Sequence, residues 1–386
     1  MKYDFILFEN YHQATHHIYD MYLIAQMLNN NGLKVAVLDI YNELPKTDNK
    51  NLTILRLPIK RVIPNDKWCR KPKGKVYNLL CLIRFLWQQH FYMKEVLKEV
   101  EPLADRFYCG SYHLSMSTIF FHSHKPCYYW GLRSSRMTHF ITHFKTNPIL
   151  GIRMLMLRNT FMKKTTQSLF VSNEIIKNEF KKLGIPTNRL IIREERCITE
   201  KGEPKYENLS NRCSFLTIGL LRPDKRIEFS INEFSKCHRD DWLFILAGRS
   251  QGDYESMISR SLVGKNNILR INKFLEYDDF NMLFSQSHFL VLADKRQPSS
   301  VTNGTMMEAL INYRPIIAPN YNPYHYYIKK YGIGITYNPD ESGSLTQAMK
   351  QAEEKGCRYF RNNIELFLKT IDFKFASKSL YQQIYE

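Results

Sequence analysis

The sequence predicts an α/β protein with two doubly wound domains. Short apolar runs typical of strands alternate with segments of helical periodicity through both halves of the chain, and this alternation indicates parallel sheets covered by helices. The 386 residues exceed what one hydrophobic core usually supports. Residues 197–212 are polar and without periodicity, which favours a linker. We therefore predict domains over 1–196 and 213–370, and we expect a C-terminal helix over 371–386 to pack back on the first domain.

The first half contains apolar runs that predict strands, in order, over 3–8, 33–40, 53–59, 105–110, 127–132, 168–171 and 188–195. Helical spacing of apolar residues predicts helices over 19–32, 77–100 and 147–164, followed by an N-capped helix that ends at Gly184. The first strand, helix and second strand form a βαβ unit, which requires parallel pairing.

The second half repeats this rhythm. Its predicted strands cover 213–219, 242–248, 267–271, 289–294 and 314–320. Helices are predicted to begin near Ile227, Tyr254, Tyr277 and Asn303, and the final segment, 364–386, is also helical in pattern.

The charge is concentrated in the first half. The net charge is +18, and residues 1–200 carry +14 of it, from 30 Lys and Arg against 16 Asp and Glu. Such a field favours an anionic partner, although a merely soluble basic surface is the ordinary alternative. Lys67, Trp68 and Arg70 lie in a basic loop, and the helix over 147–164 is basic and amphipathic. That helix fits either a bilayer interface or a domain core with solvated cations.

The compartment is suggested by what the sequence lacks. No uninterrupted apolar run reaches the roughly 20 residues of a spanning helix, and the N-terminal residues show no signal-peptide pattern. The eight Cys residues form no C-x-x-C pair and no cluster of metal spacing, which indicates reduced thiols. We expect a cytoplasmic protein that lies peripherally at the inner face of the plasma membrane.

Three strand ends of the second half carry candidate binding residues, because ligands of open α/β sheets bind outside the carboxyl ends of the strands. Gly219 is followed by Arg222 and Lys225, two cations that suit a phosphate. Gly248 lets a ligand or another loop come close. Each pattern also has a plain interpretation, a solvated cation or a tight turn.

The third strand end leads into "TNGTMMEAL", where Asn303, Gly304 and Thr305 precede a helix and Glu308 lies one turn inside it. We predict free backbone N–H groups at Gly304, Thr305 and Met306, which a helix dipole would turn toward an anion. Glu308 suits ribose hydroxyls. The plain alternative is an Asx or Thr cap with a solvated acid.

In order, "IGLLRPDKR", "FILAG" and "VLADKRQPSSVTNGTMMEALINYRPIIAP" resemble the donor half of GT-B glycosyltransferases, most nearly the retaining group of family 4. The upstream "LFVSNEIIKNEFKKLGIPTNRLII" resembles the last N-domain elements of that group, whereas residues 1–164 share only its general architecture. The resemblance implies two Rossmann-like domains that face each other across a cleft.

The resemblance also implies roles for these residues. Arg222 and Lys225 match the pair that holds the donor diphosphate, the loop over 303–305 matches the backbone that holds the same phosphates, and Glu308 matches the second glutamate of the E-x7-E motif, which binds ribose. The first glutamate of that motif falls at Ser300, which with Gly219 and Gly248 would line the donor cleft.

The first domain is expected to bind the acceptor. His16, His17 and His139 are the candidates for catalytic histidines, although surface histidines are equally consistent with the pattern. Arg133 and Arg136 join the basic loop as candidates for contact with acceptor or membrane.

The sequence thus predicts a hexosyltransferase that moves a sugar from a nucleoside-diphosphate donor to a glycan or lipid-linked acceptor in cell-envelope or exopolysaccharide biosynthesis. The resemblance implies a retaining, metal-independent reaction without a cofactor, and no Asp-x-Asp motif is present. Ser300 favours an alternative, a catalytically silent relative that binds a nucleotide sugar or glycan as a partner subunit. A nucleic-acid-binding protein is disfavoured because no recognised nucleic-acid module appears.

Overall fold

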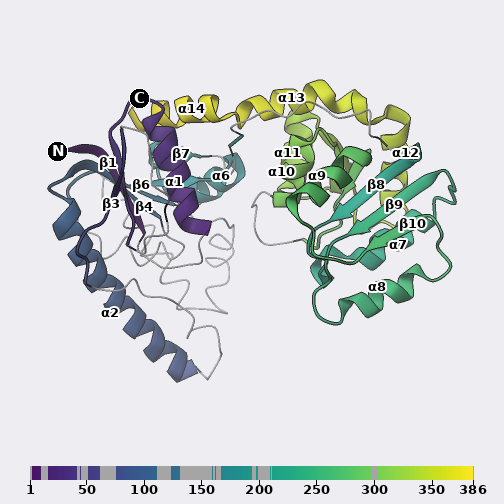
Figure 1. The fold of residues 1–386 in the computed structure, drawn as a ribbon, viewed down its shortest axis with the longest axis horizontal. Helices are drawn as coiled ribbons and strands as arrows, with labels where there is room; N and C mark the ends of the chain where they lie inside the picture. Colours follow the sequence, from purple (N-terminus) through teal and green to yellow (C-terminus); the bar gives the residue numbers. More distant parts are fainter. Residues whose placement is uncertain are drawn as a thin grey trace. The chain divides into compact units, whose positions relative to one another are not determined.

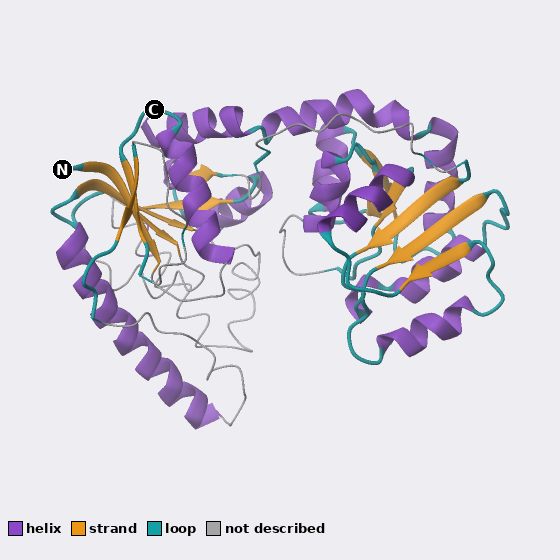
Figure 2. Ribbon diagram, in the orientation of Figure 1, coloured by secondary structure: helices purple, strands orange, loops and turns teal. Residues whose placement is uncertain are grey.

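The computed structural model describes residues 2–9, 16–40, 44, 51–60, 75–110, 123–130, 159, 161, 167–193, 197–198, 209, 211–296 and 303–385. The chain divides into two compact units, one formed by 1–197 with 373–386 and the other by 198–372 (Figure 1). Each unit contains one parallel sheet (Figure 2). The predicted α/β class with two doubly wound sheets is therefore confirmed.

In the first unit, the described strands form a sheet with the order β3-β2-β1-β4-β5-β6-β7. The strands are β1 (Tyr3–Glu9), β2 (Val35–Leu38), β3 (Leu52–Leu55), β4 (Ala104–Gly110), β5 (Cys127–Trp130), β6 (Gln167–Val171) and β7 (Leu190–Ile192). Successive residues of β1 enter different apolar clusters: Phe5 and Leu7 pack on one side, Ile6 and Phe8 on the other. Side chains alternate across a strand, so both faces of this sheet are covered.

The described helices of the first unit are α1 (His16–Asn29), α2 (Lys75–Val100), α6 (Glu174–Lys182) and the C-terminal α14 (Phe373–Tyr385). Asn173 caps α6 by accepting the N–H of Ile176 at 3.0 Å. The far end of the chain is tied into this unit, because Asn31 donates to the carbonyl oxygen of Ser377 at 2.9 Å. Gln383 exchanges two hydrogen bonds with the backbone of Ile192, which pairs the exposed edge of β7.

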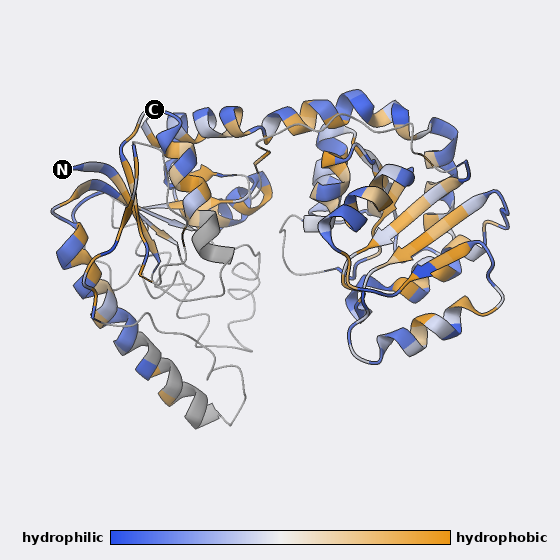
Figure 3. Cartoon of the chain, viewed as in Figure 1, coloured by the Kyte–Doolittle hydropathy of each residue, from blue (hydrophilic) through white to orange (hydrophobic). Residues whose placement is uncertain are grey.

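In the second unit, the described strands have the order β10-β9-β8-β11-β12-β13. They are β8 (Cys213–Ile218), β9 (Trp242–Ala247), β10 (Ile268–Ile271), β11 (Phe289–Val291), β12 (Ile316–Pro319) and β13 (Gly334–Tyr337). The helices are α7 (Ile227–Ser235), α8 (Tyr254–Leu262), α9 (Tyr277–Gln286), α10 (Gly304–Ile311), α11 (Tyr324–Tyr331), α12 (Ser344–Lys355) and α13 (Arg361–Thr370). Hydrophobic residues concentrate on the strands, whereas the outer faces of helices such as α13 are hydrophilic (Figure 3).

The predicted final helix is two helices. The helix is interrupted between α13 and α14 at Ile371 and Asp372, where the carbonyl oxygen of Ile371 accepts the N–H of Ile198 at 2.9 Å. The extended pairing of Asp372 with Ile198 ends the helical hydrogen bonds at this point. The sequence did not reveal the interruption, because the residues on both sides have helical periodicity.

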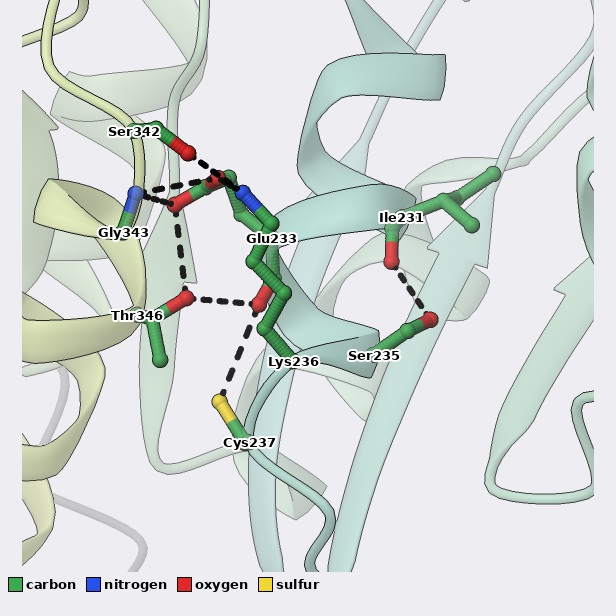
Figure 4. A network of polar contacts seen from close by, with 8 residues as sticks. All are labelled: Ile231, Glu233, Ser235, Lys236, Cys237, Ser342, Gly343 and Thr346. Carbon is green, nitrogen blue, oxygen red and sulfur yellow. Dashed lines mark hydrogen bonds and ion pairs between the residues drawn. The ribbon is translucent and has the colours of Figure 1, made fainter.

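A buried carboxylate joins two helices of the second unit. Glu233 of α7 is 2% exposed, and its two oxygens accept the N–H of Gly343 at 2.9 and 3.2 Å and the hydroxyl of Thr346 at 3.3 Å (Figure 4). Lys236 pairs with the same group. Burial alone would raise the pKa of Glu233, but these hydrogen bonds and the Lys236 charge together bring it below the usual 4.5. Glu233 therefore stabilises the N-terminus of α12 as a carboxylate.

Candidate functional site

The candidate site lies where the strand order of the second sheet reverses. β8 and β11 are neighbours at this point, and the chain leaves them in opposite directions along the sheet. Such a switch point leaves space outside the carboxyl ends of the strands, the usual position of a ligand in this class of fold. Gly219 directly follows β8, and Asp294 follows β11 by three residues.

Gly219, Lys225 and Thr305 come together at this edge. The ammonium of Lys225 donates to the carbonyl oxygen of Ile218 at 3.2 Å. A Cβ atom on Gly219 would lie 3.4 Å from Lys225 Nζ and 3.8 Å from Thr305 Oγ1. The loop after β8 and the start of α10 thus approach one point, although they are about 80 residues apart in sequence.

Two cations of different exposure lie on the loop after β8. Arg222 is the more exposed, and it pairs with Asp224 at 3.0 Å. Burial lowers the pKa of Lys225, and the negative charge of Asp294 opposes that change. A partly desolvated ammonium interacts more strongly with an anion than a solvated one does. Arg222 can add a planar fork at the rim of the site.

The start of α10 corrects one prediction. Asn303 is the N-cap, and its Oδ1 accepts the N–H of Thr305 at 2.8 Å and that of Met306 at 3.4 Å. These two N–H groups are therefore not free, and the Asx cap that the sequence left as the plain alternative is present. Among the described residues, no acceptor takes the N–H of Gly304.

The other end of Asn303 belongs to a buried polar cluster. Its Nδ2 donates to Asp294 Oδ2 at 3.0 Å and to the hydroxyl oxygen of Tyr324 at 2.8 Å. Tyr324 donates in turn to Asp294 Oδ2. Neither Asp294 nor Tyr324 was predicted as a site residue from the sequence. The signal for Asp294 was a carboxylate that ends the apolar "FLVLAD" run, whereas nothing in the sequence marked Tyr324 as its partner.

Gly248 has a role inside the fold. A Cβ atom there would lie 2.1 Å from the carbonyl oxygen of Gly219, so the group that comes close is the neighbouring loop. Arg270 donates to the carbonyl oxygen of Gly248 at 2.8 Å and holds the strand end in place. Gly248 thereby positions Gly219, and any contact of its own with a ligand stays a prediction.

The remaining predicted residues are placed unevenly. Glu308 is half-buried on the second turn of α10. His16 and His17 begin α1, but their side chains are not described. Seven further residues lie outside the described part of the chain: Lys67, Trp68, Arg70, Arg133, Arg136, His139 and Ser300. Their roles stay predictions.

Two features are absent from the part of the chain that the structure describes. Among the described residues, no group of three or more His, Cys, Asp or Glu side chains is arranged to hold a metal ion. None of their helices is long and apolar enough to cross a membrane.

No protein-family model matches the sequence, and no curated protein is significantly similar to it. Solved structures match the whole chain. Anabaena HepE in complex with UDP is 12% identical, covers 100% of this chain and 99% of its own, and has a TM-score of 0.67. WaaG, a glycosyltransferase involved in lipopolysaccharide biosynthesis, is 14% identical with 99% of each chain covered and a TM-score of 0.58. Sucrose-phosphate synthase from Thermosynechococcus elongatus is 11% identical with 99% of each chain covered and a TM-score of 0.66. TM-scores of 0.58 to 0.67 over almost the whole chain establish the fold, and identities of 11% to 14% establish nothing beyond the fold. We conclude that the chain has the GT-B fold that these glycosyltransferases share.

Proposed function

We propose that the protein is a glycosyltransferase that uses a nucleoside-diphosphate sugar. The observation that carries this proposal is the convergence of Lys225, Gly219 and the start of α10 at the switch point of the second sheet. A partly buried ammonium, a position without a side chain and a helix N-terminus together suit a diphosphate. Similar solved structures include HepE in complex with UDP and with UDP-glucose, which supports a nucleotide sugar as the substrate.

The chemistry follows from the charge that forms on the leaving group. When the bond between the sugar and the diphosphate breaks, negative charge grows on the phosphate oxygens and positive charge on the sugar ring. Lys225 and Arg222 would stabilise the leaving diphosphate as fixed cations, because preorganised charges need no reorganisation during the reaction. Glu308 would bind the ribose. We include in the proposal a retaining reaction that uses these cations in place of a metal ion.

The proposal extends to the acceptor and to the location in the cell. The net charge of +14 in residues 1–200 fits a glycan or lipid-linked acceptor of the cell envelope at an anionic membrane surface, where each well-placed Lys or Arg adds about 1 kcal/mol. The protein would then act at the inner face of the plasma membrane. Co-sedimentation with vesicles of anionic and of zwitterionic lipid tests this part, and equal binding to both would refute it.

A thermal-shift screen with UDP, GDP, ADP and their sugars tests the donor site. A ligand at 100 times its dissociation constant adds roughly 2.7 kcal/mol of stability, so the matching nucleotide should raise Tm clearly. Lys225→Ala and Glu308→Ala should reduce that rise, measured against the Tm of each variant without ligand, because loss of Lys225 also removes a counter-charge of the buried Asp294. Lys350→Ala is the matched control, because Lys350 is exposed on α12. No response to any nucleotide would refute the proposal.

Transfer and binding are separable in the same material. Release of nucleoside diphosphate from the selected sugar nucleotide, with or without acceptor, would establish catalysis. Binding without turnover would instead identify the silent relative that Ser300 suggests, a GT-B subunit that holds a nucleotide sugar or glycan for a partner.

A further inference from the structure

Asp294 is a buried carboxylate that no step of the proposed chemistry uses. It is 9% exposed and follows β11, the strand next to β8 at the switch point. Two donors share its Oδ2 atom, the hydroxyl of Tyr324 and the amide of Asn303. Desolvation of a carboxylate costs free energy unless charges or donors compensate, so its retention in this place calls for a physical reason.

Asp294 is connected to the start of α10 through one residue. Asn303 donates to Asp294 with Nδ2 and accepts the N–H of Thr305 with Oδ1. Because Nδ2 is fixed by Asp294 and Tyr324, the amide cannot rotate to present the wrong atom to the helix. The carboxylate therefore fixes the cap, and through it the direction of the first turn of α10.

Asp294 is also connected to the loop that carries Lys225. The N–H of Lys295, the next residue, donates to the carbonyl oxygen of Asp224 at 2.6 Å, which ties the end of β11 to the residue before Lys225. The side chains of Asp294 and Lys225 also interact through their charges. Asp294 is thus held through the backbone of Lys295 and through the side chain of Asn303, and its charge interacts with that of Lys225.

The pKa shifts agree with this geometry. Burial lowers the pKa of Lys225; Asp294 and Asp224 oppose that change, and Arg222 adds to it. Burial raises the pKa of Asp294, which Tyr324, Lys225 and Asn303 oppose and Asp224 reinforces. Asp294 is therefore the principal support of the charged form of Lys225, whereas the ionised form of Asp294 is supported first by the Tyr324 hydroxyl and then by Lys225. Removal of the carboxylate leaves Lys225 easier to deprotonate.

We propose that Asp294 is a positioning residue of the nucleotide site, the fixed counter-charge of Lys225 and the anchor of the Asn303 cap. This inference rests on the proposed function. Asp294 does not contact the phosphates. It maintains a charged Lys225 and an oriented α10 before the nucleotide arrives, so that binding requires no rearrangement of either element.

The test is the pH dependence of nucleotide affinity. Calorimetric titrations with UDP, GDP and ADP between pH 6 and pH 10 should show wild-type affinity falling at alkaline pH as Lys225 loses its proton. In Asp294→Asn and Asp294→Ser, the pH of this fall should move down by about one unit, because a nearby opposite charge shifts a pKa by about 1–3 units and Asp294 is the first of the charges that raise the pKa of Lys225. Using two neutral variants of different shape separates the charge from the hydrogen bonds. Each nucleotide's own ionisation is common to all variants and cancels.

Two controls separate this role from a structural one. Tyr324→Phe removes a hydrogen bond to Asp294 and keeps its charge, so the pH of the fall should stay at the wild-type value. In a Lys225→Arg background, where the cation cannot lose its proton in this range, Asp294→Asn should shift nothing. Coincident alkaline profiles for wild type and both neutral variants would overturn the inference and leave the proposed function standing. Failure of the wild type to bind any of the three nucleotides would overturn both.

Discussion

Replacement of Gly248 by alanine tests the packing that positions the candidate site. The new Cβ atom would lie 2.1 Å from the carbonyl oxygen of Gly219 and 2.8 Å from its carbonyl carbon, whereas ordinary contact begins at 3.4 Å. The ends of β8 and β9 would have to separate by about 1.3 Å, the difference between 2.1 and 3.4 Å. The hydrogen bond from the N–H of Gly219 to the carbonyl oxygen of Ala247, with an N to O distance of 3.0 Å, opposes that movement.

The expected cost has two parts. Gly248 has φ 118°, a region where a side chain costs about 1–3 kcal/mol. Forced displacement of packed atoms costs about 1–3 kcal/mol more. We therefore expect a loss of about 2–6 kcal/mol and a fall in Tm of at least about 5 °C. Gly252 is the matched control, since its φ is 55° and a Cβ there meets nothing within 4 Å, so Gly252→Ala should cost only about 1–2 kcal/mol.

Scanning calorimetry measures the stability, and hydrogen–deuterium exchange of peptides over residues 213–248 locates the loosened strands. If Gly248→Ala were no more destabilising than Gly252→Ala, the close backbone approach would not be the reason for a glycine at this position, and the account of how Gly219 is positioned would fail.

Three further predictions concern the same unit. Gly219→Ala should cost about 1–3 kcal/mol, because Gly219 has φ 105°, and less than Gly248→Ala, because its Cβ meets only the tips of two side chains at 3.4 and 3.8 Å. It should also lower nucleotide affinity at least tenfold in titration calorimetry; unchanged affinity would place the ligand elsewhere. Glu233→Gln should lower the free energy of unfolding by about 2–4 kcal/mol at pH 7. Lys236→Met should cost less, because the Lys236 side chain is 47% exposed and the bonds from Gly343 and Thr346 to Glu233 remain. Because the folded-state pKa of Glu233 lies below 4.5, its stabilisation is complete above that pH and is lost as the pH falls through the lowered value, so urea titrations of wild type and Glu233→Gln should converge in acid. Arg314→Leu should lower the free energy of unfolding by about 2–5 kcal/mol. The fully buried guanidinium donates to two carbonyl oxygens at the end of α9, at 2.6 and 3.0 Å, and leucine would leave both without this donor. A loss below 1 kcal/mol in the same titrations would show that water satisfies these oxygens.

Local pattern was sufficient for most elements of the second unit. The predicted runs from 213–219 to 314–320 contain β8 to β12, and the helices predicted near Ile227, Tyr254 and Tyr277 begin at those residues. Each of these segments has the period of its own structure. The segment from α11 to α12 was not predicted. Its first helix reads "YHYYIKKY", and aromatic residues of this kind favour strands as readily as helices.

In the candidate site, too, the sequence predicted the residues, whereas their contacts required the structure. Residue types and their order after the strands were enough to select Lys225, Gly219 and the loop at Asn303, because the carboxyl ends of parallel strands must share one edge of a sheet. Sequence could not decide which acceptor takes the N–H of Thr305. That depended on the orientation of one amide, which Asp294 and Tyr324 fix from other elements.

The alternation of strands and helices, and with it the class of fold, could be predicted from the amino-acid sequence, because hydrophobic periodicity is a local property. Packing in three dimensions was needed to show that the backbone of Gly219 requires a glycine at position 248 and that the charges of Asp294 and Lys225 interact. Each of these depends on contacts between residues far apart in the chain, and such contacts are set by how the elements pack together.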